Sequence, residues 1–116
     1  MTTKQKPETI DVKAFAQTHR PWDDMNGLVK AMARLVTVMS WGAHAWTRMS
    51  PYVLRFAVNG HHHRGHVYIV PNQSDLFDVI FTTSRGTIKH TETDIFVDGL
   101  VDTIDQVVER IPAYKQ

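Results

Sequence analysis

The chain has no cysteine, and this absence excludes a disulfide framework, a thiolate nucleophile and a cysteine-ligated metal site. No apolar run is long enough to span a bilayer, because the longest one, residues 31–39, is interrupted by Arg34. The first ten residues, MTTKQKPETI, lack the apolar stretch that marks a secretory signal. We therefore expect a cytoplasmic protein that makes no membrane contact.

Recognisable catalytic motifs are also missing. The sequence contains no GxSxG, no phosphate-binding P-loop, no HExxH and no GxGxxG. Histidine and serine both occur, but their presence without a known geometry does not define a catalytic triad. We therefore expect a non-catalytic protein with no cofactor and no small-molecule substrate.

The 116 residues suffice for one hydrophobic core. We expect a flexible N-terminal tail over residues 1–10 and a single α+β domain over residues 11–116. A formal net charge of only +1 argues against a dedicated nucleic-acid-binding protein. The charge is unevenly spread, because residues 92–109 carry six carboxylates and no basic residue.

The strongest local signal is an Asn-Gly pair between two alternating apolar runs, which is typical of a type I′ β-hairpin. With Asn59 and Gly60 as the turn, Val58 would pair with His61. Alternate residues of a strand point to opposite sides of a sheet. The predicted inner, core-facing side carries Leu54, Phe56, Val58, Val67 and Ile69. The predicted outer side carries Val53, Arg55, Ala57, His62, Arg64, His66, Tyr68 and Val70.

Three segments have apolar residues at helical spacing. Residues 11–20 predict a short helix that Pro21 ends. Residues 23–41 predict the main N-terminal helix, with Gly42 as its C-terminal stop. Residues 98–111 predict a last helix.

Further strands are predicted over residues 76–84 and 87–93, the second at a sheet edge because it is polar. Residues 43–49 fit either a strand or an extension of the preceding helix. The combined pattern predicts an α+β fold: an antiparallel meander of about four strands with an N-terminal and a C-terminal helix packed on one face.

The outer side of the predicted sheet is only half polar. Its apolar patch consists of Val53, Tyr68, Val70, Leu76 and Ile80. Such a patch requires a cover, which residues around Phe15, a second copy of the chain in a homodimer, or another protein would supply. The predicted partner-binding surface comprises Val53, Arg55, Arg64, His66, Tyr68, Val70 and Ile80.

Three alternative sites remain open. Arg55, Arg64, Tyr68 and Lys89 combine cations with an aromatic ring, as sheets that bind single-stranded nucleic acid do.

The last helix offers the second alternative, an acidic ridge formed by Asp98, Asp102, Asp105 and Glu109 at i, i+4, i+7 and i+11. The ridge either faces solvent or mimics a row of phosphates, as in a phage-type inhibitor.

The third alternative is a metal site at the hairpin tip. On a strand, His61 and His63 would lie about 7 Å apart on one side, a spacing that chelates zinc. No third ligand is evident beside them, so the competing interpretation is a polar hairpin tip without metal. Trp41 and Trp46 either line an aromatic pocket or belong to the core, and the core is favoured for them.

The run LRFAVNGHHHRGHVYIVPNQSDLFDVIFTTSRGTIK, with SWGAHAW before it and DGLVDTIDQVVER after it, resembles small uncharacterised proteins of bacteriophages and other bacterial mobile elements. The resemblance covers roughly residues 40–110. It assigns no activity, and it implies a bacterial or phage cytosolic setting with an accessory role. We therefore predict a non-catalytic interaction protein that acts through the outer side of its sheet, by self-association or by binding a protein partner.

Overall fold

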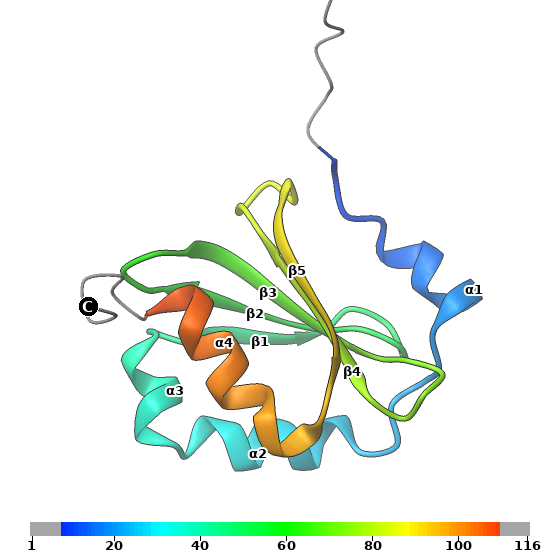
Figure 1. Cartoon of the computed structure of the whole chain (residues 1–116), viewed down its shortest axis with the longest axis horizontal. Coiled ribbons are helices and arrows are strands. Elements are labelled where there is room, and N and C mark those ends of the chain that lie inside the picture. The colour runs from blue at the N-terminus through cyan, green and yellow to red at the C-terminus, as the bar shows by residue number, and fades with distance from the viewer. Residues whose placement is uncertain (1–7, 110–116) are drawn as a thin grey trace, which may run out of the picture.

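The computed structural model describes residues 8–109. It is an α+β fold built on one antiparallel sheet with the strand order β1-β2-β3-β4-β5 (Figure 1). The strands are β1 (His44–Arg48), β2 (Leu54–Asn59), β3 (Arg64–Pro71), β4 (Phe77–Thr82) and β5 (Ile88–Ile95). The helices are α1 (Phe15–Thr18), α2 (Met25–Ala33), α3 (Val36–Ser40) and α4 (Leu100–Val108), with single 3-10 turns η1 (Val12–Ala14) and η2 (Val97–Gly99).

The α+β prediction is confirmed, but the sheet has five strands instead of about four. The additional strand is β1, which occupies the segment that the sequence left open between strand and helix. It pairs with β2 at the edge of the sheet. The predicted end of the last helix near Ile111 lies outside the described residues.

The main core lies between the sheet and the helices α2, α3 and α4. Figure 1 shows α4 running in front of the sheet, with α2 and α3 in a row beneath it. All five residues predicted for the inner side belong to this core. The helices contribute Met25, Met32, Val38, Leu100, Ile104 and Val108.

The single helix predicted over residues 23–41 is wrong, because the chain breaks at Leu35, whose φ of −80° and ψ of 135° are extended. In an unbroken helix Val38 would lie about 120° around the axis from Met32, and Trp41 would lie on the opposite side. The break rotates α3 so that all three side chains are buried. Tertiary packing therefore overrides the continuous helical pattern.

The type I′ turn at Asn59 and Gly60 is also wrong, because Val58 pairs with Gly65 and residues 60–63 form a longer loop. Neither turn residue has a positive φ. Gly60 is instead needed for close approach, since a Cβ there would overlap the carbonyl oxygen of Val108 at the end of α4. The partner of Val58 moves by four residues, an even number, so the predicted sides of both strands are preserved.

The N-terminal residues 8–18, here called the strap, cross the outer side of the sheet. The amide of Ile10 donates to the carbonyl of Gly86 at 2.9 Å, and the amide of Ile88 donates to the carbonyl of Glu8 at 2.7 Å. The end of the predicted flexible tail is therefore hydrogen-bonded to β5 and the turn before it; residues 1–7 lie outside the described part. None of the helices in residues 8–109 is long and apolar enough to cross a membrane.

Candidate functional site

Four of the five residues of the predicted outer apolar patch are covered by the strap, whereas Leu76 lies outside the covered cluster and lines the groove described below. Val53, Tyr68, Val70 and Ile80 form a second buried cluster, at most 4% exposed, and the cover includes Ile10, Val12 and Phe15 of the strap. A partner cannot reach these four side chains while the strap is in place. The apolar half of the predicted partner-binding surface is therefore an internal contact, whereas Arg55, Arg64 and His66 are not part of the cluster.

The four residues predicted to bind nucleic acid do not all lie on one accessible surface. Tyr68 is 4% exposed, so its ring cannot stack on a base. Lys89 lies on β5, where its charge acts on His63. Of the four predicted residues, Arg55 and Arg64 remain available on neighbouring strands, but Arg55 pairs with Tyr68 and Arg64 with Asn59, so the two arginines lie four residues apart along the strands.

The two candidate metal-binding histidines lie in different environments. His61 is exposed and its Nδ1 lies 2.8 Å from Glu109 Oε1. His63 is buried with its ring edge-on to Phe81, and this burial lowers its pKa. Within residues 8–109 no three His, Asp or Glu side chains converge as metal ligands.

The acidic ridge is partly used inside the fold. Asp105 accepts a hydrogen bond from the indole Nε1 of Trp41 at 2.9 Å. Glu109 accepts one from the amide of His61 at 3.0 Å. Asp98 and Asp102 are exposed, so a continuous row of four free carboxylates does not exist.

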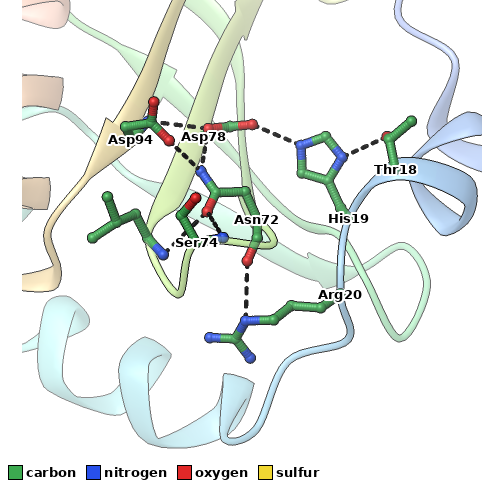
Figure 2. Close-up of polar contacts among 8 residues, drawn as sticks. Thr18, His19, Arg20, Asn72, Ser74, Asp78 and Asp94 are labelled. Carbon is green, nitrogen blue, oxygen red and sulfur yellow. Dashed lines mark hydrogen bonds and ion pairs between the residues drawn. The ribbon is translucent and has the colours of Figure 1, made fainter.

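A network centred on Asp78 joins segments that are far apart in the sequence (Figure 2). His19 Nε2 lies 2.7 Å from Asp78 Oδ2, and the other ring nitrogen lies 2.7 Å from the hydroxyl of Thr18. Asn72 Nδ2 donates to Asp78 Oδ1 at 2.9 Å, and the amide of Asp94 donates to the same oxygen at 3.1 Å. We call these five residues the Asp78 network.

Asn72 extends this network into the loop between β3 and β4. Its side-chain oxygen accepts hydrogen bonds from the amides of Ser74 at 2.9 Å and Leu76 at 3.2 Å. Its carbonyl accepts from Nε of Arg20 at 3.1 Å (Figure 2). The loop and the residues that follow the strap are thereby held against each other.

In the Asp78 network a hydroxyl, an imidazole and a carboxylate are hydrogen-bonded in series, as in an enzyme whose nucleophile is activated by a neighbouring base. However, none of Thr18, His19 and Asp78 lines the groove described next. We therefore assign the network a structural role: it ties the strap to β4 and fixes one wall of the groove. Nothing in the local sequence signals it, because His19 and Asp78 are 59 positions apart.

The groove, of about 490 Å³, lies between α2, the β3–β4 loop and the segment that leads into α4. Its lining residues are Arg20, Trp22, Asp23, Asp24, Gly27, Leu28, Ala31, Pro71, Asp75, Leu76, Phe77, Phe96 and Val97. Trp22 packs on Phe77 with ring centroids 5.2 Å apart. Phe96 is 69% exposed and Val97 is 54% exposed, so an apolar rim projects into solvent.

Carboxylates surround this apolar groove. Arg20 is the one lining cation, and its guanidinium is shared between Asp23 at 3.4 Å and Asp75 at 3.1 Å. Asp24 accepts a hydrogen bond from the amide of Gly27 and caps α2. Asp98, which follows Val97 in the chain, is exposed. The rim therefore carries net negative charge.

Trp22 also carries an unsatisfied donor. Its indole Nε1 is buried and has no hydrogen-bond partner among the described residues. Leaving a buried donor without an acceptor costs about 1–3 kcal/mol. The groove thus combines an apolar lining with a negative rim, and its lining residue Trp22 holds a buried indole donor that has no acceptor among the described residues.

The chain matches no protein-family model, no curated protein and no solved structure. A function for it therefore follows only from the geometry and chemistry of its own surfaces.

Proposed function

We propose that this chain is a non-catalytic interaction module whose groove binds a segment of another protein. The segment would present apolar side chains to the groove and Lys or Arg side chains to its rim. The observation that carries this proposal is the apolar pair Phe96 and Val97, which is exposed at the mouth of a groove bordered by carboxylates.

The apolar lining would supply most of the affinity. Phe96 is 69% exposed, so covering it would stabilise a complex by about 1–2 kcal/mol. Large exposed aromatic residues next to a pocket are typical of residues that dominate binding energy. Leu28, Ala31 and Trp22 would extend the contact along α2 and the segment before it.

The negative rim would select cationic partners. Asp23 and Asp75 are 90% and 86% exposed, so they can meet the ammonium or guanidinium groups of a partner in solvent. Exposed charge of one sign raises the rate of association with the opposite sign and disfavours partners of like charge.

This proposal moves the partner surface from the outer side of the sheet to the groove. Self-association through the outer side would first require the strap to leave its buried cluster. The resemblance to phage and mobile-element proteins adds an accessory role in a bacterial cytosol to the proposal.

The test is a selection from a displayed library of random peptides against the purified chain. We expect enrichment of peptides that combine apolar residues with Lys or Arg. Ala31→Lys would abolish their binding, because Ala31 lines the groove and a lysine there adds bulk and positive charge.

Ala33→Lys is the matched control, since Ala33 is exposed on the same helix and does not line the groove. Lysine and alanine have similar helix propensities, so both variants should fold. Selection of acidic peptides, or equal binding to the two variants, would contradict the proposal.

A further inference from the structure

The outer side of the sheet also carries a cationic patch, formed by His44, Arg55, Arg64 and His66. This patch lies outside the buried cluster that the strap covers. The strand register places His44 and His66 on either side of Ala57. Residues two apart along a strand share a side and lie about 7 Å apart, and neighbouring strands are about 5 Å apart. Arg55 and Arg64 therefore flank the two histidines on the same side.

The positive charge of this patch is not neutralised by a direct ion pair, although Glu109, which pairs with His61, lines the same hollow as Arg64. Within residues 8–109, none of its four side chains lies within ion-pair distance of a carboxylate. Burial and the neighbouring charges of Arg55 and His44 lower the pKa of His66. Nε of Arg55 is buried and has no hydrogen-bond partner among the described residues. An anion above the patch would stabilise the positive charges of Arg55 and of protonated His66.

The shape of the patch favours an extended anion over a small enclosed one. Ala57 at its centre adds little bulk, and the four cationic groups spread across three adjacent strands of the sheet. Tyr68, the neighbour of Arg55 on β3, is buried. The patch thus offers contacts for a charged backbone, and the exposed imidazole of His44 is a ring on which a base can stack.

We propose that the cationic patch binds the phosphodiester backbone of single-stranded nucleic acid without sequence preference. The near-neutral total charge of the chain is compatible with this site, because negative charge gathers at the groove and positive charge on the outer sheet. The inference is independent of the proposed function, since no residue of the patch lines the groove.

The test is the fluorescence anisotropy of a short labelled oligothymidylate titrated with the full chain over a range of salt concentrations. A logarithmic plot of affinity against salt should have a slope of about −1.4 above pH 7, where the two arginines carry the charge. Because the pKa of His66 is lowered from its usual value of 6.5, the slope should steepen toward about −2.1 only below that pH, as His66 becomes protonated. His66 is surrounded by Arg55 from β2, His44 from β1 and His63 from the loop, and circular dichroism at each pH confirms that the chain remains folded.

Arg64→Gln and Arg55→Gln should each reduce the slope by about 0.7. Arg85→Gln is the matched control, because Arg85 is exposed in the turn between β4 and β5, and it should leave the slope unchanged. Arg64 is exposed, so its variant should fold even where that of the half-buried Arg55 does not.

Three results would overturn the proposal. They are no binding at low salt, an equal effect of Arg64→Gln and Arg85→Gln, and competition by heparin as strong as that by an unlabelled oligonucleotide of equal charge. Loss of binding in Arg64→Gln with peptide binding in the groove intact would support it and separate it from the proposed function.

Discussion

Replacing Asp78 by alanine should destabilise the fold and release the strap. The Asp78 carboxylate accepts hydrogen bonds from three segments: from His19 at 2.7 Å, from the side chain of Asn72 at 2.9 Å and from the amide of Asp94 at 3.1 Å. Its side chain is only 15% exposed, and that of His19 is 13% exposed. Asp78→Ala would therefore leave the donors of His19 and Asp94 without an acceptor in a site that water barely reaches, while Asn72 Nδ2 would keep its hydrogen bond to Asp94 Oδ1 at 2.8 Å.

The magnitude follows from the number of donors. A hydrogen bond to a charged group contributes about 1.5–3 kcal/mol, but bonds to one acceptor are not additive, and the freed donors would partly turn to solvent. We expect Asp78→Ala to reduce the free energy of unfolding by about 3 kcal/mol. For a domain of this size that corresponds to a decrease in Tm of about 12 °C.

The assay is urea and thermal denaturation followed by circular dichroism, together with amide hydrogen exchange of Ile10. Asp98→Ala is the control, because Asp98 is exposed and should change stability by less than about 0.5 kcal/mol. A double-mutant cycle with His19→Ala should give a coupling energy of about 1–2 kcal/mol. If Asp78→Ala were as stable as the control, or if exchange at Ile10 were unchanged, the role assigned to the network would be refuted.

Three further predictions concern the strap and the loop between β2 and β3. Phe15→Asp should loosen the strap and expose the second buried cluster, so binding of a hydrophobic dye and self-association in sedimentation should both increase; a monomer that binds no dye would contradict this. Gly60→Ala should destabilise the fold by about 2 kcal/mol, because its Cβ would overlap Val108, and an unchanged urea midpoint would show that the loop can move aside. Burial lowers the pKa of His63, so the His63 ring gains a proton at higher pH in the unfolded chain than in the folded chain. The free energy of unfolding should therefore be greatest above about pH 6.5 and fall at lower pH, and His63→Gln should flatten this profile.

The sides of the central strands could be predicted from the sequence, because alternation has a period of two residues. The predicted hairpin register was wrong by four positions, yet Leu54, Phe56 and Val67 still lie in the core. A register error of an even number of residues leaves each side chain on its predicted side of the sheet. Local pattern therefore determined the sides of the strands although it misplaced the turn.

Features that depend on distant contacts could not be predicted in the same way. The break at Leu35 exists because Val38 and Trp41 must reach the same core as Met32, which local helical spacing does not show. The position of Gly60 depends on the end of α4, which lies more than forty residues later in the chain.

The candidate site was missed for the same reason. The groove is assembled from the residues after the strap, the β3–β4 loop, α2 and the segment before α4. The one local signal was the apolar pair Phe96 and Val97 between acidic residues. The strap's role as the cover of the outer patch was one of three alternatives that the sequence left open.

The most direct test of the groove as the partner site uses the indole N–H signals of the three tryptophans in a proton–nitrogen correlation spectrum. Trp22 lines the groove, whereas the indole of Trp41 donates to Asp105 and Trp46 stacks on Phe56. During titration with a selected cationic, apolar peptide, the signal of Trp22 should shift to saturation while those of Trp41 and Trp46 stay in place. A saturating peptide that left the Trp22 signal unmoved would contradict the proposed function.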